Sequence, residues 1–179
     1  RAWTVRKLVE DYLTRAAERL AEGTISQRRQ QLSAHVLPII GHLPAKDVTP
    51  ADIVDITERA AGKSNNVARL VLTAVREVFA HAVARHVVAA NPCAHVKAKA
   101  VIGPRPVNRT RIKLTEPELR AMLPVLHTIG RQNELAIKVL LATATRIGEL
   151  TRAEWGHIDF EKRLWTIPAA NIKGRSVKA

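Results

Sequence analysis

Apolar residues recur every three or four positions along the N-terminal half of the chain, a spacing that predicts amphipathic helices. In the first such run, Thr4 is a suitable N-cap and Gly23 is expected to end the helix. Its apolar positions share one helix face and are Val5, Leu8, Val9, Tyr12, Leu13 and Ala16. The pattern predicts a helix that buries this face and exposes the other.

Two more helices are predicted before residue 62. One begins at Thr24, continues to about His35 and stops at Pro38, and its inward positions are Ile25, Leu32 and Val36. The next follows the sequence Thr49-Pro50-Ala51-Asp52 and extends to Ala61. This sequence combines an N-cap, a first-turn proline and an acid near the positive end of the helix dipole.

The longest helix of this region is predicted after Gly62-Lys63-Ser64 and extends to about His86. Its broad apolar face consists of Val67, Leu70, Val71, Val75, Val78, Phe79 and Ala82. Four helices in under about a hundred residues predict a compact bundle. We therefore expect a first domain over residues 1–95.

Residues 94–113 differ from the helical region in composition, because they carry no acid and several bases. The bases are Lys97, Lys99, Arg105, Arg109, Arg111 and Lys113. The sequence Gly103-Pro104-Arg105-Pro106 disfavours a helix. We interpret residues 96–113 as a basic, proline-broken interdomain linker that could track phosphates, and a disordered tether is the alternative.

A second domain is predicted over residues 114–179, beginning at a capping box, Thr115-Glu116-Pro117-Glu118. An apolar helix follows over residues 134–142, and residues 143–145 break its pattern before a short helical stretch toward Trp155. Alternating apolar residues on either side of the polar turn 161–163 then predict a β-hairpin. The expected fold class is mainly α, a four-helix bundle followed by an α+β region with a small antiparallel sheet.

Charge indicates the partner. With 29 Lys and Arg against 16 Asp and Glu, the net charge is +13, which favours a polyanion, with nucleic acid as the first candidate. No apolar run is long enough to span a membrane, and a single cysteine excludes an internal disulfide and fits a reducing cytoplasm. The scattered histidines lack metal-ligand spacing, so we expect no metal and no small-molecule cofactor.

Two helices carry side chains suited to DNA. On the longest helix a polar stripe lies opposite the apolar face, and the residues that precede this helix could hold a phosphate at its positive end. These residues are Asn66, Arg69, Thr73 and Arg76, preceded by Lys63 and Ser64. The second helix adds Ser26, Gln27 and Arg28. An ordinary solvated helix face is the alternative for both helices.

Arg146 lies at the bend between two predicted helices, where its planar, permanently charged guanidinium could bind two phosphate oxygens at once. Lys173 follows the predicted hairpin, beside Gly174. An isolated arginine and a hairpin lysine are typical of phosphodiester chemistry without a metal. The alternative for Arg146 is a surface ion pair with Glu149 or Glu154.

The segment over residues 140–175 resembles the catalytic domain of the tyrosine recombinases, the phage integrase family. The residues that carry the likeness are Arg-Ile-Gly-Glu-Leu at 146–150, Trp-Gly-His-Ile-Asp at 155–159, Trp-Thr-Ile-Pro at 165–168 and Ile-Lys-Gly-Arg at 172–175. The helical region ahead of it resembles the family's core-binding domain, a SAM-like bundle whose second and fourth helices cross in the major groove. The family often has a glycine where this chain has Ala144, which puts the local backbone in doubt.

The resemblance implies a role for each matching residue. Arg146 would stabilise charge on the scissile phosphate, Glu149 would support the site, and Lys173 would protonate the leaving oxygen, although Arg175 or Lys178 could be the base that reaches the groove. Arg175 would in any case contact DNA. The family's His-x-x-Arg and tyrosine nucleophile have no match, and Tyr12 occupies an apolar helix position. We therefore expect the chain to be a piece of a longer protein, to bind DNA and not to cut it alone.

The family likeness implies double-stranded DNA as the partner and other recombinase protomers on DNA when the protein is full length. It implies strand cleavage and rejoining through a 3′-phosphotyrosyl bond, as in phage or mobile-element integration and excision. One rival is a non-catalytic helical DNA-binding protein or a truncated integrase remnant. A second rival is a protein-interaction bundle whose charge is incidental.

Overall fold

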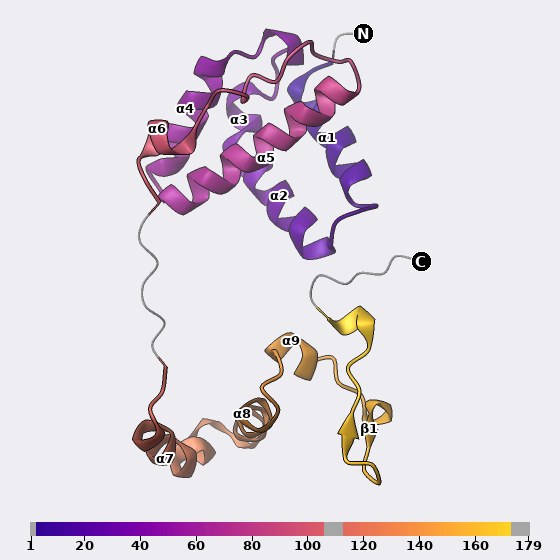
Figure 1. The fold of residues 1–179 in the computed structure, drawn as a ribbon. Helices are drawn as coiled ribbons and strands as arrows, with labels where there is room; N and C mark the ends of the chain where they lie inside the picture. The colour runs from indigo at the N-terminus through magenta and orange to yellow at the C-terminus, as the bar shows by residue number, and fades with distance from the viewer. Residues whose placement is uncertain (1–2, 106–112, 173–179) are drawn as a thin grey trace. The chain divides into compact units, whose positions relative to one another are not determined.

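The computed structural model describes residues 3–105 and 113–172 (Figure 1). The chain divides into two compact units, residues 1–108 and 109–179. The first unit is helical, and the second combines helices with a two-stranded antiparallel sheet. The expected fold class, mainly α with a small antiparallel sheet, is confirmed.

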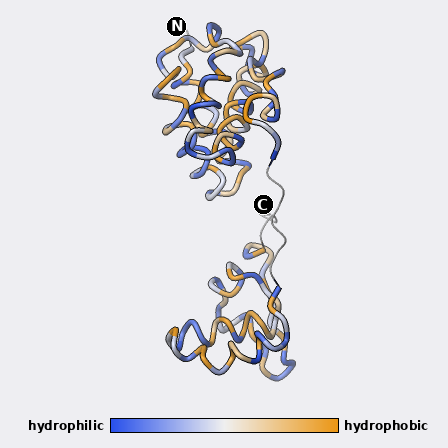
Figure 2. Tube along the Cα trace, turned by 90° about the vertical axis from the view of Figure 1, so that its left-hand side faces the viewer, coloured by the Kyte–Doolittle hydropathy of each residue, from blue (hydrophilic) through white to orange (hydrophobic). Residues whose placement is uncertain are grey.

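Four long helices form the first unit, together with two short ones and a 3₁₀ turn over Ala45–Asp47. The long helices are α1 (Val5–Ala16), α2 (Glu22–His35), α4 (Pro50–Ala61) and α5 (Asn65–Ala84), and the short ones are α3 (Leu37–Ile40) and α6 (Ala98–Ile102). Hydrophobic and hydrophilic residues alternate along these helices (Figure 2), as an amphipathic bundle requires. The apolar residues meet in one core.

Helix start signals in the sequence are confirmed. The Thr4 hydroxyl accepts a hydrogen bond from the backbone N–H of Lys7, and Thr49 forms a capping box with Asp52 at the start of α4. Ser64 caps α5 by accepting a hydrogen bond from the Asn66 N–H. Each of these side chains satisfies a backbone donor that the helix leaves unpaired.

The boundary between the first two helices was predicted wrongly. α1 ends at Ala16, and α2 begins at Glu22, so Gly23 and Thr24 lie within the first turn of α2. No side chain caps this start, which explains why a capping signal could not locate it. The inward positions of α2 were predicted correctly, since Ile25, Leu32 and Val36 are all buried.

The core of the first unit is aliphatic and is centred on α5. Phe79 and Leu8 are the largest fully buried side chains, and Val71, Val75 and Val78 of α5 are also fully buried. α5 packs against α1, α2, α4 and α6, and its longest contact is with α4. Each of the other long helices therefore buries part of its apolar face against α5.

The start of the predicted linker belongs to the first unit. Val96 is buried in the core, and α6 packs against α4 and α5 (Figure 1). The expectation of a linker from residue 96 is therefore wrong for residues 96–102. The reason is that Val96, Ala98, Val101 and Ile102 cover apolar surface of the bundle, a pattern that the dense basic residues between them concealed.

The second unit begins with α7 (Glu116–Val125), which the predicted capping box of Thr115 and Glu118 initiates. A 3₁₀ turn over Leu126–Ile129 leads into α8 (Arg131–Thr143) and the short α9 (Ile147–Leu150). The hairpin follows, with β1 (Ile158–Asp159) paired to β2 (Leu164–Trp165) after a 3₁₀ turn over Trp155–His157, and a last 3₁₀ turn spans Ala169–Asn171. The predicted hairpin is thus confirmed.

Large apolar side chains remain exposed on the second unit. Trp155 is 80% exposed and stacks on Phe160, which is 72% exposed. Trp155 therefore does not pack in a core among the described residues of this unit. Among the described residues of the unit, Leu126 is the one hydrophobic residue that is buried, so little apolar surface stabilises it internally.

Candidate phosphate-binding corner and DNA-binding surface

The corner between α8 and α9 is built on a left-handed residue. Ala144 has φ 53° and ψ 21°, and its N–H donates to the carbonyl of Leu140 to close α8. The backbone then extends at Thr145 and Arg146 before α9 begins. Arg146 therefore lies at a bend between two helices, as predicted, and the bend is made by a left-handed alanine where the family often has glycine.

Arg146 is fixed at this corner by Glu149. The Glu149 carboxylate accepts a hydrogen bond of 2.8 Å from the Arg146 backbone N–H and one of 2.9 Å from its Nη1. The Glu149 side chain is 8% exposed and that of Arg146 is 68% exposed. This asymmetry distinguishes the pair from an ordinary surface ion pair, because the acid lies inside and the guanidinium faces outward with most of its donors open.

These bonds set the ionisation of the acid. The Arg146 backbone N–H and then its guanidinium lower the pKa of Glu149 below its ordinary value of 4.5. The carboxylate is therefore charged throughout the neutral range, and it keeps Arg146 in place without a proton to lose. An arrangement of this kind can hold a phosphate oxygen in front of a preorganised guanidinium.

The candidate base cannot be placed. Lys173 and Arg175 lie outside the described residues, as does Lys178. The described chain ends just before them, with the side chain of Asn171 donating to the carbonyl of Arg152. This bond joins the stretch after β2 to the turn that follows α9, and Arg146 is the N-cap of the same helix.

On α2, the predicted contact residues divide into two groups. Ser26 and Gln27 are exposed. Arg28 instead turns toward the bundle, where its guanidinium bonds to the Tyr12 hydroxyl and pairs with Glu77 of α5. Its side chain is 17% exposed, so Arg28 joins α1, α2 and α5 and has few donors left for DNA.

On α5, the polar stripe is also divided. Lys63, Asn66 and Thr73 are exposed, and Ser64 is used as the cap. Arg69 and Arg76 both donate to main-chain carbonyls of the segment that follows the bundle, Gly103 at 2.6 Å and Val96 at 2.7 Å. Base or phosphate contact by these two arginines stays a prediction, and the structure gives them a competing role.

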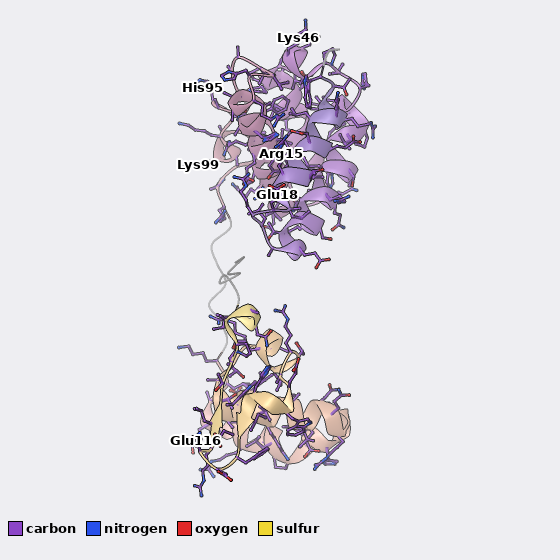
Figure 3. All side chains as sticks on the ribbon, turned by 90° about the vertical axis from the view of Figure 1, so that its right-hand side faces the viewer. Arg15, Glu18, Lys46, His95, Lys99 and Glu116 are labelled. Carbon is purple, nitrogen blue, oxygen red and sulfur yellow. The ribbon has the colours of Figure 1, made fainter. Side chains whose placement is uncertain are left out.

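The basic residues after α5 are only partly described. Lys97 and Lys99 are exposed at α6, and Lys99 lies at the edge of the first unit (Figure 3). Arg105 is also exposed. Arg109 and Arg111 lie outside the described residues.

Arg29 is a cation that sequence reasoning missed. It is exposed on α2, and its side chain makes no hydrogen bond or ion pair within the described parts of the chain, unlike that of its neighbour Arg28. The helical period gave no signal for it, because Arg29 follows Ile25 by four residues and precedes Leu32 by three, on the side of α2 that carries the inward positions. The presence of Glu77 on α5, which captures Arg28, could not be inferred from α2 alone.

Tyr12, the only tyrosine in the sequence, is 4% exposed. Its hydroxyl donates to Glu77 at 2.7 Å. A tyrosine that acts as a nucleophile must reach a phosphorus atom, and this hydroxyl is held within the helical bundle. The geometry supports a structural role for Tyr12.

Two family models match the sequence and together cover most of it. The model described as phage integrase central domain matches residues 5–99, and the one described as phage integrase family matches residues 113–178. The helical bundle and the corner with its arginine thus fall in separate matches. The chain belongs to the phage integrase family, the tyrosine recombinases.

Curated relatives are integrases. The chain is 28% identical to prophage integrase IntZ of Escherichia coli K12 over 95% of this chain and 42% of that protein. It is 30% identical to the integrase of Shigella phage Sf6 over 87% of this chain and 40% of that one. The chain therefore spans about two fifths of the length of these relatives.

Solved structures share the fold. The Tn1549 transposon integrase in complex with a circular intermediate DNA matches with a TM-score of 0.72 at 20% identity, over 89% of this chain and 51% of that one. A lambda integrase tetramer bound to a Holliday junction matches with a TM-score of 0.73 at 19% identity, over 89% of this chain and 46% of that one.

No helix in the described part of the chain is long and apolar enough to cross a membrane.

Replacing Ala144 by glycine should stabilise the corner. A left-handed conformation costs an L-residue about 1–2 kcal/mol, and glycine avoids this cost. Part of the gain is lost, because the unfolded state of glycine has a larger conformational entropy. We expect Ala144→Gly to raise the free energy of local opening by about 0.5–1 kcal/mol. Hydrogen exchange of the Leu150 amide, which donates to the Arg146 carbonyl, measures this change.

Ala142→Gly is the matched control, because residue 142 lies inside α8. There the same substitution should destabilise the helix by about 1 kcal/mol. Equal effects at the two positions would contradict the left-handed conformation at Ala144.

The Glu149 pair should persist in mild acid. Because its folded pKa is lowered, the carboxylate contributes stability that is fully present above pH 4.5 and is lost as pH falls through the lower folded pKa. Titration of the Glu149 side-chain carbon signal by NMR should give a midpoint below 4.5, and the same titration in urea should return to the ordinary value. A native midpoint at or above 4.5 would show that Arg146 is not held by this acid.

Proposed function

We propose that this chain is the DNA-binding region and part of the active site of a site-specific recombinase. The complete protein would cut and rejoin duplex DNA through a 3′-phosphotyrosyl intermediate, as in the integration or excision of a phage or mobile element. The cytoplasm is the expected compartment, and no metal or small-molecule cofactor takes part. The chain itself would bind DNA and remain inactive until the rest of the protein supplies the tyrosine.

The observation that carries this proposal is the outward-facing guanidinium of Arg146, held from behind by buried Glu149. Strand transfer places extra negative charge on the nonbridging oxygens of the scissile phosphate. A guanidinium that is already oriented stabilises that charge without reorganising during the reaction. Arg146 is thus assigned to the phosphate, and Glu149 is a positioning residue that acts through it.

Lys173 is proposed to protonate the 5′ oxygen that leaves when the tyrosine attacks phosphorus. In this step the tyrosine hydroxyl loses its proton to solvent as its oxygen forms a bond to phosphorus, the bond from phosphorus to the 5′ oxygen breaks, and the departing oxygen takes the proton from the ammonium group. Rejoining reverses the sequence. Arg175 and Lys178 follow on the same stretch, and either could take this role in place of Lys173.

DNA binding is proposed for the exposed polar surface of α2 and α5 and for the basic residues beyond them. Side chains without an acidic partner gather there, and phosphate contact by such cations releases counterions. The described residues assigned to this surface are Ser26, Gln27, Arg29, Lys63, Ser64, Asn66, Thr73, Lys97, Lys99 and Arg105. Arg109, Arg111 and Arg175 are proposed to contact DNA as well. Arg28, Arg69 and Arg76 are left out of this surface, because each already bonds within the first unit, although Arg76 is itself exposed.

Assembly with further protomers is proposed for the complete protein on DNA. The support is the lambda integrase neighbour, which is a tetramer on a Holliday junction. The chain alone is expected to be a monomer in solution.

A non-catalytic DNA-binding protein is the alternative, and it would share the binding surface but make no use of Arg146. The complete protein separates the two functions when it is given a duplex with a nick that traps the covalent intermediate. We expect Arg146→Ala to reduce covalent complex formation by about 10²–10³-fold, as removal of one oxyanion donor commonly does, with little change in binding.

Arg152→Ala is the matched control, since Arg152 is an exposed arginine in the turn just after α9. It should leave the yield of covalent complex unchanged. A complete protein that binds the duplex but forms no covalent complex would favour the non-catalytic alternative.

Arg29 should contact phosphate and Arg19 should not. The affinity of the chain for a mixed-sequence duplex is expected to fall steeply between about 50 and 200 mM salt. Arg29→Ala should weaken binding and reduce the slope of log K against log salt by about 0.9, the value for one lost phosphate contact. Arg19 provides the control, because it is exposed in the turn after α1 and its side chain makes no hydrogen bond or ion pair among the described residues. Equal slopes for wild type and Arg29→Ala would remove Arg29 from the interface.

A further inference from the structure

Helix α5 bonds to the chain that follows it through three side chains of its polar face. We use the name return segment for residues 86–103, which run back along the bundle after α5 to α6 beside α4 (Figure 1). Arg76 Nη2 donates to the Val96 carbonyl at 2.7 Å and Arg69 Nη2 to the Gly103 carbonyl at 2.6 Å. Asn65 Nδ2 donates to the Ile102 carbonyl at 3.4 Å. Three side chains of the polar face of α5 are thus hydrogen-bonded to main-chain carbonyls of the return segment.

Apolar residues of the return segment also hold it against the core of the first unit. Val88, Cys93 and Val96 are buried in the core, and Ala98, Val101 and Ile102 pack against it. Asn91 joins the segment to α5 at its near end, since its Nδ2 donates to the Arg76 carbonyl and its Oδ1 accepts from the Cys93 N–H. Polar and apolar contacts therefore fix the return segment along most of its length.

The guanidinium of Arg69 lies within this joint. Its Nε is buried and has no hydrogen-bond partner among the described residues, while Nη2 donates to the Gly103 carbonyl. Moving Arg69 out to a phosphate would break that bond and leave the Gly103 carbonyl to find another donor. A side chain used for loose surface contact would not be enclosed in this way.

We propose that Arg69 and Arg76 are positioning residues that fasten the return segment to α5, and that this attachment fixes where the basic residues of α6 and the exit of the chain from the first unit lie. The two arginines act on DNA through Lys97 and Lys99, which the fastened segment presents, and not by contacting phosphate themselves. The DNA part of this proposal rests on the proposed function. The attachment does not depend on DNA.

The attachment also limits the reach of the connection to the second unit. A connection that began at residue 96 would have 18 residues up to Lys113, whereas one that begins after Gly103 has 10. At no more than about 3.4 Å per residue, the maximum span falls from about 61 Å to about 34 Å. Loss of the attachment would therefore let the two units separate further around a duplex.

Cys93 provides a direct reporter of the attachment. It is the only cysteine in the sequence, it is 0% exposed, and it lies on the return segment. Burial raises the pKa of its thiol to about 12, although the positive charge of Arg76 acts to lower this pKa. A disulfide reagent such as 5,5′-dithiobis(2-nitrobenzoate) can react with it only when the segment lifts, because the thiolate is the reactive form.

The test compares Arg69→Lys and Arg76→Lys with wild type in the 179-residue chain. Lysine keeps the charge, so a phosphate contact and the electrostatic effect on Cys93 both survive, whereas the bond of the guanidinium to the carbonyl is lost. We expect each variant to raise the labelling rate of Cys93 about tenfold, the factor that follows from losing one hydrogen bond to a charged group. Arg19→Lys should leave the rate unchanged.

Labelling in low urea identifies which opening is measured. A shallow urea dependence reports local lifting of the segment, and a steep one reports unfolding of the whole bundle. Unchanged rates, or rates that rise only with a steep urea dependence, would overturn the proposed attachment.

DNA binding decides the second half of the proposal. Arg69→Ala and Arg76→Ala should weaken binding to a mixed-sequence duplex yet leave the slope of log K against log salt within the error of wild type. A slope lowered by about 0.9 for each variant would show direct phosphate contact and contradict the positioning role. A wild-type chain that does not bind the duplex would refute the proposed function, and the labelling result would still decide the attachment.

Discussion

Helix α5 supports the first unit because its apolar face and three side chains of its polar face are held within the chain. Its apolar face packs against α1, α2 and α4, and side chains of its polar face bond to the carbonyls of Ile102, Gly103 and Val96. Glu77 on the same helix captures Arg28 and the hydroxyl of Tyr12. These bonds engage Arg28, Arg69, Arg76 and Tyr12 within the first unit, so each would have to give up a bond before it could contact DNA. The basic surface that remains open to DNA therefore consists of side chains that do not take part in these bonds.

This allocation of partners explains what the sequence could and could not predict. Helical period and capping residues predicted α4 and α5 nearly to the residue, because Thr49, Asp52 and Ser64 act locally. The start of α2 was missed, because no side chain caps it. The roles of Arg28, Arg69 and Arg76 depend on groups far away in the sequence, and a helical stripe does not reveal such partners. A free arginine and a paired one look alike until the partner is located.

The second unit shows the reverse case. Arg146 and Glu149 are three residues apart, so their pairing is local, and the motif predicted both the bend and the acid that supports it. The left-handed Ala144 was signalled only as a departure from the glycine that the family often has. The exposure of Trp155 could not be inferred from its apolar character. Burial depends on the neighbours that the fold supplies, and the described part of this unit supplies few.

The most direct test of this account is an NMR titration of the side-chain Nε–H signals of the arginines with a mixed-sequence duplex. The account predicts that the signals of Arg29 and Arg146 shift on binding, because their guanidinium groups are open to phosphate. It also predicts that the signals of Arg28, Arg69 and Arg76 stay near their free positions. Large shifts of Arg69 and Arg76 with no change at Arg29 and Arg146 would contradict it.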